Sequence, residues 1–221
     1  MATLGVAGKR RTALAAGALA VVVAVPVGIA VIHEGFPVSA VDLYSRDVWV
    51  TNGAKLLTGR LNMQIEELNG GVSMGSRNFD VLQDGDQVFV FDDELGSVER
   101  VDPAYTSLGQ RIEVPVGSTV DYGADLMAVT DPAGAVWVIP TVGELQFDRV
   151  TAEPSGEFGD GAQAGVADDG ATWVVSVQDS ALMRVLGPGA VPERMLDLTL
   201  DDFELTAVGD QPVILDRDAN E

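Results

Sequence analysis

The chain has 221 residues, 34 of them acidic and 13 basic, for a net charge of -21, and it contains no cysteine. This composition excludes disulfides, thiolate metal sites and cysteine nucleophiles, and its negative charge opposes binding to the phosphates of nucleic acid. Lys9, Arg10 and Arg11 precede the first acidic residue, Glu34, so the rest of the chain has a net charge of -24. Cations and basic protein surfaces suit such a domain as partners, although the charge also serves solubility alone.

Residues 12–32 are uncharged and mostly apolar. As a helix they extend about 31 Å, which matches the hydrocarbon core of a bilayer. Basic residues precede the run and acidic residues follow it, so the positive-inside tendency places residues 1–11 in the cytoplasm. The sequence predicts a single-pass plasma-membrane protein whose signal anchor leads, through a linker and first strand at residues 33–46, to an extracytoplasmic domain.

A cleaved signal peptide is the alternative interpretation, with Gly28-Ile29-Ala30 as a small-x-small cleavage site. The apolar run is longer than the usual signal-peptide core of about 7–15 residues, which favours retention as an anchor. Both interpretations export the domain that follows.

After the apolar run, a motif of an aromatic residue between two apolar or β-branched residues recurs behind turn signals. Its copies are Val48-Trp49-Val50, Val88-Phe89-Val90, Val136-Trp137-Val138 and Thr172-Trp173-Val174, with a weaker Pro212-Val213-Ile214. The central residues are 40, 48, 36 and 40 positions apart. An arginine follows the aromatic residue by 11 positions in three copies and by 12 in the fourth; these are Arg60, Arg100, Arg184 and Arg149.

Short valine-rich tracts bounded by Gly, Asp and Pro indicate strands. We expect strands at residues 125–130 and 203–208, before the turn and the aromatic strand, and strands also within residues 56–68. A loop such as Asp92–Gly96 or Val177–Ser180 then leads to the strand with the arginine. Gly156–Gly165 is expected to be a long loop between repeats.

A period of about 40 residues with three or four strands indicates a β-propeller, in which stacked sheets bury one another's faces. The fold class predicted is all-β: an array of about four to five three- or four-stranded blades over residues 47–221, the last incomplete, preceded by one transmembrane helix. The aromatic residues are expected to fill the space between blades. The arginines are expected to pair with acids or cover blade edges.

Gly85–Phe91 followed by Gly96–Asp102 resembles the blades of PQQ-like, YVTN-type and streptogramin-lyase-like propellers. The basic N-terminus, single span and repeat together resemble envelope proteins of high-GC bacteria, in which fibronectin type III or Ig-like domains follow the propeller. This resemblance implies that the chain is a fragment of a longer protein. Two alternatives are that strands around Ala40–Val50 close the ring with the C-terminal strands, and that a partner completes an open ring.

The single histidine, His33, lies at the predicted membrane edge, which excludes a serine-histidine triad in the domain. Four acidic groups remain that could supply acid–base pairs or bind calcium; they are Asp92-Asp93-Glu94, Asp168-Asp169, Asp201-Asp202 and Asp84-Gly85-Asp86. None matches a full calcium-loop pattern, and solvated turns explain them equally well. The sequence therefore predicts no catalytic, cofactor-binding or metal-binding residue, with calcium kept as an alternative.

The function predicted is a membrane-anchored, non-enzymatic binding or scaffold module that presents a propeller face to a protein or cell-envelope component. One alternative is a ligand sensor that relays occupancy through a membrane partner. Another is a carboxylate-dependent enzyme acting on glycans, which requires two facing acids in a cleft.

Overall fold

The computed structural model describes residues 47–63, 65–200 and 202–217. Within these ranges, no helix has the length and apolarity needed to cross a membrane. The predicted span at residues 12–32, the cytoplasmic segment 1–11 and the linker 33–46 lie outside them.

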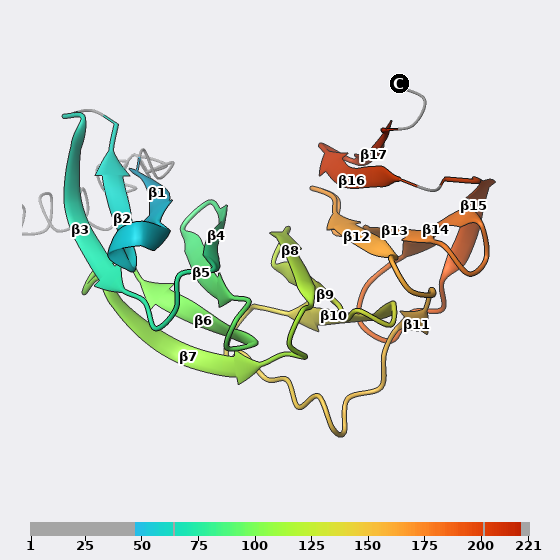
Figure 1. Ribbon diagram of the computed structural model, residues 1–221, viewed down its shortest axis with the longest axis horizontal. Helices are drawn as coiled ribbons and strands as arrows, with labels where there is room; N and C mark the ends of the chain where they lie inside the picture. Colours follow the sequence, from blue (N-terminus) through green and yellow to red (C-terminus); the bar gives the residue numbers. More distant parts are fainter. Residues whose placement is uncertain (1–46, 64, 201, 218–221) are drawn as a thin grey trace, which may run out of the picture. The chain divides into compact units, whose positions relative to one another are not determined.

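The described residues form five antiparallel sheets in which strands follow chain order (Figure 1). The first sheet contains β1 (Asp47–Asn52), β2 (Leu57–Asn62) and β3 (Glu67–Ser73), with the short 3-10 helix η1 (Gly53–Lys55) between β1 and β2. The second contains β4 (Phe79–Asp84), β5 (Gln87–Asp92), β6 (Ser97–Asp102) and β7 (Ser107–Glu113). The third contains β8 (Thr119–Gly123), β9 (Leu126–Thr130), β10 (Ala135–Pro140) and β11 (Gly156–Glu157). The fourth contains β12 (Gln163–Val166), β13 (Thr172–Ser176), β14 (Ala181–Val185) and β15 (Glu193–Asp197), and the fifth contains β16 (Phe203–Val208) and β17 (Gln211–Asp216).

Contacts between neighbouring sheets join their leading strands in succession. β4 contacts both β1 and β8, and β12 contacts both β8 and β16. Successive meandering sheets that pack through their first strands are the arrangement of propeller blades. The prediction of an all-β array of three- or four-stranded units is thus confirmed, with two strands described in the fifth sheet.

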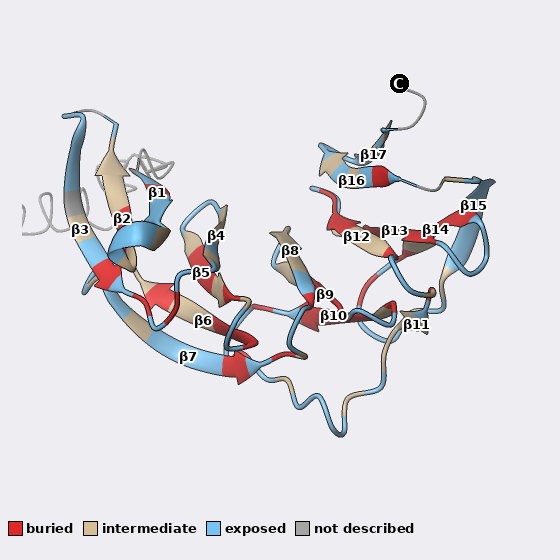
Figure 2. Cartoon of the chain, viewed as in Figure 1, coloured by how far each residue is buried: buried red, intermediate tan, exposed pale blue. Residues whose placement is uncertain are grey.

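Burial is concentrated in the middle strands of the three four-stranded sheets (Figure 2). In β13 all five residues are buried, whereas all five residues of the outer strand β15 are exposed. Because side chains alternate across a strand, each middle strand can pack against two neighbouring sheets. Val88 and Val90 of β5 join the core with the first sheet, and Phe89 between them joins the core with the third. This double burial explains why the sequence of β5 is almost continuously apolar.

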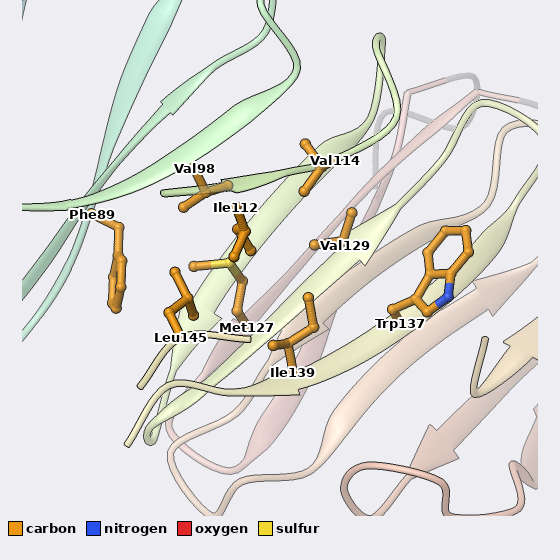
Figure 3. Close-up of a cluster of buried hydrophobic side chains, with 9 residues drawn as sticks. All are labelled: Phe89, Val98, Ile112, Val114, Met127, Val129, Trp137, Ile139 and Leu145. Atoms are coloured by element: carbon orange, nitrogen blue, oxygen red, sulfur yellow. The ribbon is translucent and has the colours of Figure 1, made fainter. Parts of the chain in front are cut away.

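The core between the second and third sheets contains nine buried side chains (Figure 3). The second sheet and its end supply Phe89, Val98, Ile112 and Val114, and the third sheet supplies Met127, Val129, Trp137 and Ile139. Leu145 comes from the connection that follows β10. Figure 3 shows Met127 beside Ile112, where the two sheets meet.

The third repeat differs from the predicted register. Trp137 lies on the third strand of its sheet, β10, whereas Phe89 and Trp173 lie on the second strands of theirs. Trp49 lies on β1, the first described strand of a three-stranded sheet, and this strand matches β5 because Trp49 and Phe89 each lie opposite an arginine. The residue corresponding to Phe89 is Ala128, because each is the third residue of a strand that follows a two-residue turn. The Asp131–Gly134 turn therefore connects the second strand to the third, and the motif assignment at residue 137 was wrong by one strand.

The prediction that Arg149 is the repeat arginine of the third unit is wrong for the same reason. Arg60, Arg100 and Arg184 lie directly opposite Trp49, Phe89 and Trp173 in the strand register. The position opposite Ala128 is Val138, and Arg149 instead lies in an exposed turn after β10. The similar spacing of 12 residues in the sequence does not reflect an equivalent position.

The strands expected at residues 125–130, 203–208 and within 56–68 are confirmed by β9, β16, β2 and β3. The segment Gly156–Gly165 is shorter as a loop than predicted, because it contains β11 and the first residues of β12. The long connection lies just before it, at residues 141–155, which contain no strand.

Candidate binding groove at the outer edge of the third sheet

The third sheet has an incomplete outer strand. β11 pairs with β10 only at Ala135 and Val136, whereas β7 and β15 contain seven and five residues. The carbonyl oxygen of Val136 accepts a hydrogen bond from the Ser155 amide at 2.7 Å on this outer side. Beyond Val136, the outer edge of β10 faces the loop of residues 141–155 instead of a strand.

Contacts from the second sheet hold the start of this loop. The guanidinium of Arg100 donates to the carbonyls of Thr141 and Gly143, the latter at 2.7 Å. The amide of Leu145 donates to the side-chain oxygen of Gln110 on β7 at 3.1 Å. The loop is therefore fixed to the preceding sheet before it returns to β10.

The later part of the loop is held by a turn and by the indole of Trp137. The carboxylate of Asp148 accepts hydrogen bonds from the Val150 amide at 2.9 Å and the Thr151 hydroxyl at 3.0 Å. The indole N–H of Trp137 donates to the carbonyl of Ala152 at 3.1 Å. A ring of Phe147 meets the Trp137 ring edge to face, with centroids 5.9 Å apart.

These elements enclose an open groove of about 570 Å³, here called the β10 groove. Its floor and walls come from β10, the end of β7, residues 145–155 and the Pro188-Gly189 turn of the fourth sheet. Trp137, Leu145 and Phe147 give it an apolar side, and Asp148 and Glu153 give it an acidic side. A volume of this size suits a few residues of a peptide or a small ligand.

The charges of the groove are unequally compensated. Arg111 forms an ion pair with Glu99 at 3.1 Å, so its charge is already partnered on the second sheet. The two hydrogen bonds from Val150 and Thr151 lower the pKa of Asp148, which stays ionised. Arg149 offsets part of the charge of Asp148, and the lining keeps a net negative charge through Asp148 and Glu153, in keeping with the acidic composition of the domain.

The acidic groups singled out in the sequence serve turns and sheet contacts instead. Asp92 is buried and accepts hydrogen bonds from the Ser76 hydroxyl at 2.8 Å and the Leu95 amide at 3.0 Å. Asp93 accepts from the Asn78 side chain at 2.6 Å. Both residues thus stabilise the hairpin between β5 and β6.

The remaining groups are similarly engaged. Asp84 accepts a hydrogen bond from the Ala124 amide in the third sheet at 2.9 Å. Asp169 accepts from the Ala171 amide and forms an ion pair with Arg184 at 2.8 Å, and Asp202 bonds to Arg217 at 3.4 Å. Asp201 and His33 lie outside the described residues. Within residues 47–63, 65–200 and 202–217, no three acidic or histidine side chains form a group that could hold a metal ion.

The arginines of the repeat link sheets or pair with acids. Arg184 pairs with Asp169 as predicted, and its guanidinium carbon lies 5.4 Å from the centroid of the Trp173 ring. Arg60 and Arg100 instead donate to backbone carbonyls of the following sheet, Arg60 to that of Pro103 at 3.0 Å. The backbone carbonyls that accept these bonds carry no sequence signal, because any residue can supply one.

Sequence reasoning also missed Asp121, which lies on β8. Its carboxylate accepts a hydrogen bond from the Val166 amide on β12 at 2.7 Å, and so joins the third sheet to the fourth. Burial raises the pKa of Asp121, although the Val166 and Tyr122 amides oppose that rise. The sequence signal was only an acidic residue within an otherwise strand-like tract.

No family model matches the chain, and no curated protein matches it. The structure is similar to dihydro-heme d1 dehydrogenase NirN in complex with DHE, with a TM-score of 0.52, 12% identity, and coverage of 80% of this chain and 42% of that one. It is similar to selenomethionine-substituted virginiamycin B lyase from Staphylococcus aureus, with a TM-score of 0.51, 14% identity, and coverage of 77% and 59%. It is also similar to Hsv2 from Kluyveromyces lactis, with a TM-score of 0.52, 12% identity, and coverage of 73% and 51%.

The chain spans about two-fifths to three-fifths of the length of these solved structures. At 12–14% identity the similarity concerns the fold alone. The described residues form a propeller-like array of antiparallel sheets of the kind found in virginiamycin B lyase.

Proposed function

We propose that this chain is a membrane-anchored extracytoplasmic binding or scaffold module, and that the β10 groove holds its partner. The observation that carries the proposal is the break in the third sheet, where a groove of about 570 Å³ replaces most of an outer strand. The other four-stranded sheets have longer outer strands at this position. Loops held on a rigid sheet are common sites of recognition.

A non-catalytic role is supported by the chemistry of the groove. Asp148 is held ionised by its hydrogen bonds, which makes it a poor general acid. The buried carboxyl with a raised pKa, Asp121, faces the Val166 amide between β8 and β12 and does not line the groove. The acidic side chains therefore stabilise the fold or supply charge, and the apolar wall supplies contact area.

The anchoring part of the proposal rests on the sequence. The uncharged run at residues 12–32, preceded by Lys9, Arg10 and Arg11, has the length and charge asymmetry of a signal anchor. The resemblance to envelope proteins adds that fibronectin type III or Ig-like domains follow the propeller in a longer protein. An immunoblot of the source cells would test this, since a band of the size of this chain would contradict it.

Localisation can be tested with the full chain carrying a C-terminal tag. We expect the tag in the membrane fraction and expect protease added to spheroplasts to remove it. Recovery of the tag in the soluble cytoplasmic fraction would contradict the anchor. Replacing Val21, Val22 and Val23 with aspartate should abolish membrane retention if the run is the anchor, because each charge at the bilayer centre costs about 2.5–3.5 kcal/mol.

Binding can be tested by capture from a solubilised envelope fraction with the full chain. We expect the Phe147→Ser variant to lose a partner that the wild type retains, because Phe147 forms part of the apolar wall beside Trp137. Tyr105→Ser is the matched control, because Tyr105 is 82% exposed and lies outside the groove. Equal capture by all three proteins would contradict the groove as the binding site.

A further inference from the structure

The free edge of β10 presents backbone hydrogen-bonding groups to the β10 groove. Backbone N–H and C=O groups point to alternate sides along a strand. Because the carbonyls of Gly134 and Val136 accept hydrogen bonds on the outer side, those of Val138 and Pro140 also point outward. Among the described residues, the outward N–H and C=O of Val138 have no hydrogen-bond partner.

This edge is recessed, and it is not part of an open surface. Val138 is 6% exposed, and its side chain packs in the core between the third and fourth sheets. An extended segment beside it would continue the sheet, as a fourth strand does in the second sheet. Its side chains would alternate between the Trp137 and Phe147 side of the groove and the Pro188 side.

Charge selects among the extended segments that could fit. Arg111 is already paired with Glu99, and Arg149 next to Asp148 offsets part of the charge of that carboxylate. The lining residues Asp148 and Glu153 still leave the groove with a net negative charge. The whole chain after residue 33 adds a net charge of -24. An acidic segment would be repelled, whereas a lysine or arginine would be attracted and could also contact the Trp137 ring.

We propose that the β10 groove binds an extended segment of a partner protein, in which apolar residues alternate with lysine or arginine, by strand addition to the edge of β10. Main-chain hydrogen bonds to Val138 supply affinity, and the aromatic and acidic walls supply specificity. The proposal rests on the binding role proposed above and adds the chemistry of the partner.

The test uses the full chain in detergent and a synthetic peptide of alternating valine and lysine, with binding measured by fluorescence anisotropy. One comparison peptide replaces lysine with glutamate, and another carries N-methyl groups on alternate amides. We expect saturable binding of the lysine peptide. The N-methylated peptide should bind at least about tenfold more weakly, since one lost hydrogen bond accounts for about that factor. The glutamate peptide should also bind at least about tenfold more weakly, because the acidic residues of the groove repel it. Equal binding of the lysine and glutamate peptides would overturn the proposal.

Two variants locate the site. Val138→Pro removes the outward N–H but no hydrogen bond to β9, so the strand should tolerate it, and we expect about tenfold weaker binding. Glu153→Lys reverses a charge in the groove and should weaken binding about threefold to tenfold, while Glu67→Lys, the same change on β3, should leave it within about twofold. Unchanged binding by both groove variants would overturn the proposal. If Val138→Pro does not fold, unchanged binding by Glu153→Lys overturns it.

These experiments distinguish a failure of strand addition from a failure of the proposed binding role. If Phe147→Ser loses the envelope partner but the lysine peptide does not bind the wild type, the groove still binds and strand addition is wrong. If the peptide binds at the groove but no partner depends on Phe147, the proposed role as a scaffold is wrong.

Discussion

Arg100 lies directly opposite Phe89 in the register of β5 and β6, and its guanidinium carbon is 5.3 Å from the centroid of the Phe89 ring. The same guanidinium donates to the carbonyls of Thr141 and Gly143, beyond the end of β10. Phe89 is fully buried in the core that the second and third sheets share. One cross-strand pair therefore joins two sheets through both an apolar contact and hydrogen bonds.

Replacing Arg100 with methionine should lower the free energy of unfolding by about 2 kcal/mol, because it removes the cation–π contact and the charged donors while keeping an apolar stem. Urea unfolding of the full chain, followed by tryptophan fluorescence, measures the change. Arg149→Met is the matched control, since Arg149 lies in an exposed turn, and should change the value by less than about 0.5 kcal/mol. Equal losses in both variants would show that the intersheet link contributes nothing.

Replacing Phe89 with alanine should lower the free energy of unfolding by about 3–5 kcal/mol. The change opens a cavity between two sheets, and the surrounding side chains fill such a cavity only in part. The same unfolding measurement applies, and Tyr105→Ala is the control for loss of an exposed aromatic side chain. A loss below about 1 kcal/mol would mean that the neighbouring sheets move together to fill the space.

The strands were predictable where local patterning and tertiary packing agree. Turn signals such as Asp84-Gly85-Asp86 and Gly209-Asp210 mark the hairpins between β4 and β5 and between β16 and β17. The third repeat was misplaced because Trp137 and the turn at Asp131–Gly134 imitate the motif one strand later. Ala128, the true equivalent of Phe89, carries no aromatic signal, so only strand order reveals it.

The groove could not be predicted for a different reason. It depends on the absence of strand pairing along β10 beyond Val136, and on hydrogen bonds from Arg100 and Gln110 in another sheet. Residues 141–155 mix apolar side chains such as Leu145 and Phe147 with polar ones, a composition that by itself does not mark a groove. A binding site formed where a repeat is interrupted is visible only after the strands are aligned in space.

Calcium should leave the stability unchanged, because Asp84, Asp92, Asp93 and Asp169 use carboxylate oxygens for hydrogen bonds within the protein. A site with a Kd of about 10 μM would add about 2.7 kcal/mol at about 1 mM calcium. Thermal unfolding with calcium and with a chelator measures the difference, and magnesium at the same concentration controls for general ionic effects on this acidic chain. A rise with calcium alone would contradict the prediction.

The pH dependence of stability should identify Asp121 as a destabilised carboxylate. Burial raises its pKa above the ordinary value of 3.8, so the folded state binds the proton more tightly than the unfolded state. The free energy of unfolding therefore falls as pH rises through the window above 3.8, because the buried carboxyl loses its proton. This loss of stability stops growing once the pH is above the raised pKa. The Asp121→Asn variant keeps an oxygen to accept the Val166 amide and does not ionise, so its stability relative to the wild type should increase with pH across this window.

Asp148→Asn should show the opposite trend, which makes it a matched control for Asp121→Asn. Hydrogen bonds lower the pKa of Asp148 below 3.8, so ionised Asp148 stabilises the wild type above that value, and this stability is lost as pH falls through the lowered pKa. The asparagine variant should therefore lose stability relative to the wild type as pH rises. Urea unfolding of the three proteins from about pH 3 to 7 measures both trends. If the free energy of unfolding changed with pH in the same way for Asp121→Asn and the wild type, the pKa of Asp121 would not be raised. Water would then reach the carboxylate between β8 and β12 even though it accepts the Val166 amide.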